Sequence, residues 1–254
     1  KPKRNAPAGA LLHPQLPADQ RHDYHIVSDD LGAGGPKERF RHNIAAIETL
    51  QRVEADNRLA TPEEQAILAQ YVGWGGLSEA FDERNTSWSQ EYLQLKSLLS
   101  NQEYTAARES TLTAFYTPPM VIRAMYQALA NMGFESGNIL EPSCGVGNFM
   151  GMLPDAMQDS KIYGVELDSI TGRIAQQLYQ NAAIGVTGFE KTKFPDSFFD
   201  VAIGNVPFGS FKVMDKKYDR NNFLIHDYFF AKALDHVRPG GVVAFITSKG
   251  TLDK

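Results

Sequence analysis

Short apolar runs alternate with amphipathic stretches through the second half of the chain. The apolar runs predict strands at 138–140, 162–165, 184–186, 201–203 and 242–246. The amphipathic stretches between them predict helices at 147–157, 169–179 and 223–237. An apolar stripe predicts one more helix, which starts at Thr117-Pro118 and presents Ile122, Met125, Leu129 and Met132. This alternation favours a parallel, doubly wound α/β sheet, in which ligands bind beyond the carboxyl ends of the strands.

The first half of the chain has a helical pattern. One apolar stripe in residues 36–110 consists of Ile44, Ile47, Leu50 and Val53. Two capping boxes, Thr61-Pro62-Glu63-Glu64 and Ser100-Asn101-Gln102-Glu103, predict helix starts. Gly73-Trp74-Gly75-Gly76 predicts a tight turn whose tryptophan packs between helices. Because residues 1–30 are proline-rich and aperiodic, we expect a linker or wrapping arm at 1–35, a helical extension at 36–110 and a sheet domain at 111–254.

Composition narrows the possible functions. The 254 residues are 43% hydrophobic, enough to bury a substantial core, and the net charge is −5. Contact with nucleic acid would therefore need a local basic patch. Cys144 is the one cysteine, so no intrachain disulfide can form, and no apolar run is long enough to span a bilayer. We expect a cytoplasmic protein with no membrane partner, and we expect no metal site.

The first two predicted strands end in candidate cofactor-binding residues. Glu141-Pro142-Ser143-Cys144-Gly145-Val146-Gly147 opens into a helix, and its glycines would let the backbone approach a ligand closely. It lacks the third glycine of a dinucleotide fingerprint, which disfavours a nicotinamide cofactor. Glu166 follows the second strand, where a carboxylate is placed to accept the hydroxyls of a ribose. Asp168 is expected to cap the next helix.

The next two strand ends carry aromatic and amide groups. Phe189 could stack on an adenine or pack in the core, and both readings stay open. After the fourth strand, Asn205 offers an amide oxygen and Val206 a backbone carbonyl. Two such acceptors would draw an exocyclic amine toward tetrahedral geometry and free its lone pair. Pro207 would fix the backbone, and Phe208 would stack on a planar group.

Taken in order, these motifs resemble the S-adenosylmethionine-dependent amino-methyltransferases that act on adenine N6 in DNA. The resemblance implies a Rossmann-like class I methyltransferase sheet, an α/β fold with its C-terminal strands absent, preceded by the mostly helical extension. It implies S-adenosyl-L-methionine as cofactor and DNA as partner. The implied cofactor contacts are Thr117, Glu141, Pro142, Ser143, Gly145, Gly147, Glu166, Phe189 and Asn205. The implied catalytic residues are Asn205, Val206, Pro207 and Phe208.

Two upstream segments are similar to a narrower group. Leu31-Gly32-Ala33-Gly34-Gly35-Pro36-Lys37 and Tyr71-Val72-Gly73-Trp74-Gly75-Gly76-Leu77 resemble large methyltransferase–helicase fusion proteins of bacterial mobile elements and phage. This similarity implies further domains in the parent chain, such as a helicase.

The chain also departs from the family pattern. Val206 replaces the usual proline of the catalytic motif and brings an extra N–H. Gly188 stands where an acidic residue is common, and Glu190 could substitute for it. The sheet would end after the fifth strand with an unpaired edge. Residues 1–110, a partner or a longer parent chain could cover that edge.

The mechanism that follows is direct in-line transfer of a methyl group to the N6 amine of a flipped adenine. A loop after the catalytic motif carries a local run of cations, which could be merely solvated or could bind phosphates. We expect DNA contacts from Lys212, Lys216, Lys217 and Arg220. His226 and Asp227 could contact the flipped base, but exposed polar helix residues are the commoner explanation. Two alternatives stay open: an amino-methyltransferase for protein glutamine or RNA, and a non-catalytic cofactor- or DNA-docking module.

Overall fold

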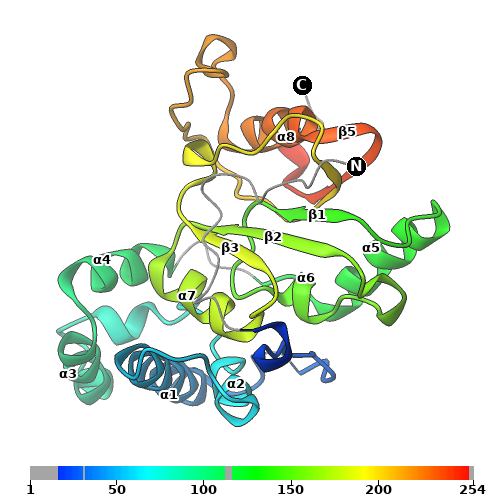
Figure 1. Ribbon diagram of the computed structural model, residues 1–254. Helices are drawn as coiled ribbons and strands as arrows, with labels where there is room; N and C mark the ends of the chain where they lie inside the picture. Colours follow the sequence, from blue (N-terminus) through cyan, green and yellow to red (C-terminus); the bar gives the residue numbers. More distant parts are fainter. Residues whose placement is uncertain (1–16, 31, 112–115, 252–254) are drawn as a thin grey trace.

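The computed structural model of the protein describes residues 17–30, 32–111 and 116–251. Leu31, most of the predicted arm and the first residues of the predicted sheet domain lie outside these ranges. The five strands are β1 (Asn138–Glu141), β2 (Lys161–Glu166), β3 (Ala183–Val186), β4 (Phe199–Asn205) and β5 (Val237–Ile246). They form one parallel sheet in the order β3-β2-β1-β4-β5. Figure 1 labels β3, β2, β1 and β5 of this sheet. The predicted α/β fold with a parallel sheet is confirmed.

The order of the strands sets the position of the candidate site. The chain moves outward from β1 to β3 and then crosses back, so that β4 lies on the other side of β1. The carboxyl ends of β1 and β4 therefore flank the point at which the strand order reverses. In open α/β sheets this is the place where ligands bind.

Helices cover both faces of the sheet. They are α5 (Pro119–Asn131), α6 (Asn148–Gly151), α7 (Ser169–Leu178) and α8 (Ile225–His236). Neighbouring strand residues face opposite sides: Ile139 packs with α5 and α6, whereas Leu140 packs with α8. The predicted helix at 147–157 is wrong in length, because α6 ends at Gly151 just before Pro154 and only a short 3₁₀ turn follows.

The first half of the chain forms a helical layer, defined here as α1 (Pro36–Ala55), α2 (Pro62–Leu68), α3 (Ser89–Leu98) and α4 (Asn101–Ser110). Both predicted capping boxes are confirmed, since the side chains of Thr61 and Ser100 each accept from a backbone N–H three residues on. The layer packs against α7, on the side of the sheet that ends in β3. It does not cover β5, and among the described residues no strand pairs with the outer edge of β5.

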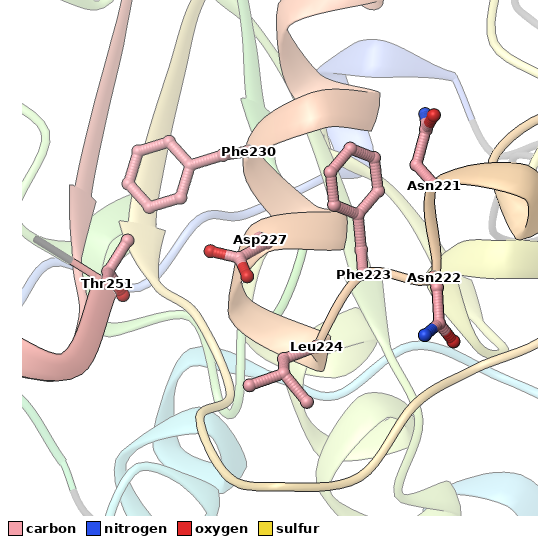
Figure 2. Close-up of a pocket in the computed structure, with 7 residues that line it drawn as sticks. All are labelled: Asn221, Asn222, Phe223, Leu224, Asp227, Phe230 and Thr251. Atoms are coloured by element: carbon pink, nitrogen blue, oxygen red, sulfur yellow. The ribbon is translucent and has the colours of Figure 1, made fainter. Parts of the chain in front are cut away.

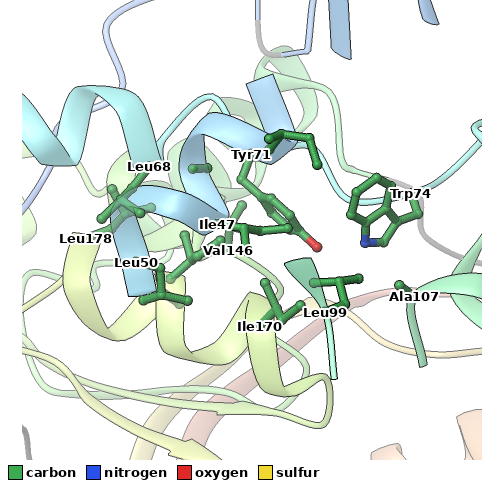
Figure 3. Close-up of a cluster of buried hydrophobic side chains, with 14 of the residues drawn as sticks. Ile47, Leu50, Leu68, Tyr71, Trp74, Leu99, Ala107, Val146, Ile170 and Leu178 are labelled. Atoms are coloured by element: carbon green, nitrogen blue, oxygen red, sulfur yellow. The ribbon is translucent and has the colours of Figure 1, made fainter. Parts of the chain in front are cut away.

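The helical layer and the sheet domain share one hydrophobic core (Figure 3). Trp74 is 2% exposed and meets the ring of Phe81 edge-on, with 5.4 Å between the centroids. The same cluster contains Val146 and Met150 at the start of α6, and Ile170 of α7. The packing of the layer therefore bears directly on the loop after β1.

A short N-terminal segment crosses this junction. Tyr24 N–H donates to the carbonyl of Leu178 at 2.8 Å, and Ile26 N–H donates to the carbonyl of Gly151 at 2.8 Å. The Gln65 side chain of α2 donates to the carbonyl of His22 at 2.9 Å. The segment thus links α2, α6 and α7.

Because the core is shared, we predict that Trp74→Ala lowers the free energy of unfolding by about 3–5 kcal/mol and that the variant still unfolds in one transition. Urea denaturation followed by both fluorescence and circular dichroism measures this. Leu93→Ala, at a side chain 65% exposed on α3, is the matched control and should have little effect. Separate transitions for the helices and the sheet would contradict the shared core.

Candidate active site

The loop after β1 turns sharply at two glycines. Gly145 and Gly147 take φ values of +56° and +85°, a left-handed conformation that favours glycine. A Cβ atom at Gly147 would overlap the ring of Tyr179, which packs against this glycine. The loop therefore combines a sharp turn with a close contact that no side chain at position 147 could share.

Glu166 is fixed at the carboxyl end of β2, beside this loop. Its carboxylate accepts the N–H of Gly145 at 2.8 Å and the N–H of Asp168 at 2.8 Å. Burial raises the pKa of Glu166 to about 7, although the two backbone N–H groups lower it. Asp168 caps α7 by accepting from Thr171 N–H at 2.8 Å, as predicted. Each oxygen of Glu166 keeps a lone pair that can accept a further hydrogen bond.

Glu141 ends β1 with a buried carboxyl group. Its Oε2 is buried without a hydrogen-bond partner. Burial and the nearby charge of Glu166 raise the pKa of Glu141 well above its usual range. A Cβ on Gly204 of β4 would lie 3.3 Å from Cγ of Glu141, so the ends of β1 and β4 are in close contact.

The end of β4 carries a second unpaired polar atom. Oδ1 of Asn205 is buried and has no hydrogen-bond partner. Val206 is 1% exposed, and its N–H donates to the carbonyl of Ile246 at 3.1 Å. The extra N–H that valine introduces is therefore satisfied by the end of β5. Phe208, two residues on, is 47% exposed.

Two unpaired polar atoms, Oε2 of Glu141 and Oδ1 of Asn205, belong to the ends of neighbouring strands at the switch point and fit a ligand with polar groups. Asn205 comes from β4 and Glu141 from β1, while Glu166 stands at the end of β2 on the other side of the glycine loop. The residues present therefore fit a nucleoside-type cofactor with ribose hydroxyls. Within the described part of the chain, no cluster of His, Cys, Asp and Glu could hold a metal ion.

Tyr116 joins this group, although the sequence analysis did not select it. Its ring lies 3.7 Å from where a Cβ on Gly145 would be. Burial and the charges of Glu166 and Asp168 raise the pKa of Tyr116 above its usual range. Its neighbour Thr117 is 8% exposed. The signal that could have found Tyr116 is its place directly before Thr117-Pro118.

Phe189 packs in the hydrophobic core, which is one of the two roles expected for it from the sequence. It is 3% exposed and packs on Phe229 of α8, with 5.0 Å between the ring centroids. The carboxylate of Glu190 folds back over Gly188, where a Cβ atom would overlap it. The expectation that His226 is exposed is wrong, since its side chain is buried in the first turn of α8.

Of the cations on the loop between β4 and α8, two have partners within the protein and two are exposed on the loop. Lys217 is paired with Asp196 at 3.2 Å and with Asp235 at 2.9 Å, which raises its pKa. Lys212 donates to the side chain of Asn222 at 2.6 Å. Lys216 and Arg220 are exposed, on a loop that projects from the body of the molecule (Figure 1, orange).

A pocket of about 440 Å³ lies beside this loop, between the start of α8 and the chain after β5 (Figure 2). It is lined by Asn221, Asn222, Phe223, Leu224, Asp227, Phe230 and Thr251. These residues follow β4 and β5, so the pocket opens at the same edge of the sheet as Asn205.

The fold and the site together define a Rossmann-like methyltransferase. The N-6 DNA Methylase family profile matches residues 98–254, and the chain belongs to that family. Its cofactor is S-adenosyl-L-methionine. No helix in the ranges that the structure describes is both long and apolar enough to cross a membrane.

Individual relatives cover the chain unevenly. Defense against restriction protein B of Escherichia phage P1 is 28% identical over 213 residues, which are 82% of this chain and 8% of that protein. The type II methyltransferase M.CvrRI of Paramecium bursaria Chlorella virus XZ-6E is 33% identical over 113 residues, or 44% of this chain and 29% of that enzyme. A solved S-adenosylmethionine-dependent methyltransferase from Mesorhizobium loti is 22% identical over 48% of this chain and 52% of its own, with a TM-score of 0.32.

The contact between Gly147 and Tyr179 leads to a matched pair of variants. Gly147 and Gly133 both have φ +85°, but nothing lies within 4 Å of a Cβ on Gly133. We predict that Gly133→Ala costs only the backbone strain, roughly 1–2 kcal/mol. Gly147→Ala should cost more and should abolish binding of S-adenosylmethionine, because the ring of Tyr179 must move. Denaturation and calorimetric titration measure both effects, and equal losses in the two variants would contradict the packing argument.

Proposed function

We propose that this chain is the catalytic region of an enzyme that transfers the methyl group of S-adenosylmethionine to N6 of adenine in DNA. The observation that carries the proposal is the buried, unpartnered amide oxygen of Asn205 at the end of β4. It lies where the strand order reverses, beside the glycine loop. An acceptor left without a donor there is poised for an amine that comes from the substrate.

The cofactor-binding residues are the ones that surround the loop after β1. The sulfonium cofactor supplies an activated methyl group. Glu166 accepts hydrogen bonds from the ribose hydroxyls. The backbone of the loop residues Pro142, Ser143, Gly145 and Gly147 lies against the cofactor. Thr117 and Glu141 bind the amino-acid end of the cofactor. Phe189 supports the cofactor site from the hydrophobic core, since its ring packs on Phe229 of α8.

The catalytic residues orient and activate the amine. The side-chain oxygen of Asn205 and the backbone carbonyl of Val206 accept its two N–H groups, which localises the lone pair on nitrogen. Pro207 keeps the preceding carbonyl in an extended conformation, and the exposed ring of Phe208 stacks on the base. Catalysis then rests on positioning and preorganised acceptors, with the transfer in line.

DNA binding uses the loop between β4 and α8. Lys212, Lys216 and Arg220 contact phosphates. Lys217 braces the loop instead, because two aspartates already neutralise it. The target adenine leaves the duplex so that its N6 amine reaches Asn205 and Val206. The pocket beside the loop offers further aromatic and hydrogen-bonding groups to the DNA.

The chain spans 8% of the phage P1 protein and 29% of the Chlorella virus enzyme, so the activity of a whole parent protein is itself a proposal. We propose that the region works together with further domains such as a helicase, on the resemblance of residues 71–77 to methyltransferase–helicase fusion proteins.

The function is tested with Asn205→Ala. We predict that methyl transfer to duplex DNA falls on the order of a hundredfold or more, because one preorganised acceptor is lost, while cofactor affinity stays within a few-fold. Labelled S-adenosylmethionine, followed by digestion to nucleosides, measures transfer and identifies N6-methyladenine. Asn131→Ala, at an exposed asparagine on α5, is the control. Methylation of RNA or of protein glutamine in place of DNA would contradict the proposal, and so would cofactor binding without any transfer.

The raised pKa of Glu166 predicts a pH dependence. The ionised carboxylate accepts both ribose hydroxyls, and protonation removes one acceptor. With a pKa of about 7, affinity for the cofactor should fall roughly tenfold from pH 8 to pH 6. Calorimetric titrations with the cofactor across this pH range compare wild type with Glu166→Gln. Protonation of the cofactor affects both proteins alike, so it cancels when their affinities are compared. Parallel profiles for the two proteins would assign the effect to another group.

A further inference from the structure

The projecting loop between β4 and α8 is held in shape from inside. Oδ2 of Asp215 accepts from Nζ of Lys232 at 2.9 Å and from the hydroxyl of Tyr228 at 2.7 Å. Lys232 is 3% exposed and also donates to the carbonyl of Phe189 at 2.8 Å. Removing one partner of a buried ion pair is strongly destabilising, so this clamp resists opening.

Further hydrogen bonds fix the rest of the loop. The N–H of Asp215 donates to the Asp219 side chain at 2.8 Å, which closes a tight turn. At the base, the N–H of Ile225 donates to the carbonyl of Phe211 at 3.0 Å. The loop is therefore a stiff projection at the edge of the candidate active site (Figure 1).

The stiff loop presents apolar side chains to solvent. Met214, next to the clamped Asp215, is 86% exposed, and Phe211 is 54% exposed. Lys216 and Arg220 are exposed on the same loop. An exposed apolar side chain flanked by cations has the chemistry of a wedge for nucleic acid, since cations bind phosphates while Met or Phe inserts between base steps.

We propose that Met214 is a wedge that enters the base stack of duplex DNA when the target base leaves it, and that the Asp215–Lys232–Tyr228 clamp stiffens the loop for this insertion. The proposal rests on the proposed function, because it assigns a role in holding open the DNA substrate. Duplex DNA is favoured as the partner by Lys216 and Arg220, exposed cations on the same loop, although the chain as a whole carries a net charge of −5. Met214 acts on the stack and does not touch the reacting atoms.

The test compares two labelled duplexes that are identical except for one abasic site. A wedge fills a gap without unstacking a base pair, so wild type should bind the abasic duplex roughly tenfold more tightly than the intact one. Met214→Ala should lose this preference. Lys216→Ala should weaken binding to both duplexes alike and reduce the salt slope by about 1. Met132→Ala, at a methionine 68% exposed beyond α5, is the matched control and should bind as wild type.

Asp215→Asn tests the clamp with little change in shape. Faster trypsin cleavage at Lys216 and a reduced preference for the abasic duplex are expected, and unchanged values for both would overturn the role of the clamp. An abasic preference that Met214→Ala keeps, or that wild type lacks, would overturn the wedge. Formation of N6-methyladenine by the same preparations is measured separately. Methylation without a preference for the abasic duplex would overturn the wedge proposal alone. A preference for the abasic duplex without any methylation would overturn the proposed function.

Discussion

The reversal of strand order between β1 and β4 is the constraint on which the candidate site depends. Because β4 lies beside β1 and not beside β3, the buried carboxyl of Glu141 and the amide of Asn205 stand at the ends of neighbouring strands. Oε2 of Glu141 and Oδ1 of Asn205 have no hydrogen-bond partner among the described residues. Burying a polar atom without a partner costs free energy. The fold thus leaves a buried carboxyl group and a buried amide oxygen without a protein partner at the ends of neighbouring strands.

The helical layer takes part in this arrangement through packing. Trp74 and Val146 belong to one buried cluster, so the layer supports the glycine loop after β1. The segment at 22–26 adds hydrogen bonds to the ends of α6 and α7. A family profile that begins at residue 98 covers the chemistry, but it leaves out the residues that stabilise the loop's outer side.

The strand ends could be predicted from sequence because apolar runs and turn residues are local signals. The same locality explains the capping boxes. It also explains why the apolar pattern predicts too long a helix at α6, since the pattern continues past Gly151 to Pro154. Pairings between distant residues left no such signal. The neutralisation of Lys217 needs Asp196 and Asp235, which come from separate segments, and the burial of His226 depends on how α8 meets the sheet.

The hydrogen bond from Val206 to Ile246 changes what the proposed catalytic motif requires of its second residue. A proline there would leave the last carbonyl of β5 without this donor, so in this chain the imino acid would be the costlier choice. What position 206 demands is a small apolar side chain that fits a site only 1% exposed. A search pattern that insists on two consecutive prolines would therefore pass over chains built in this way.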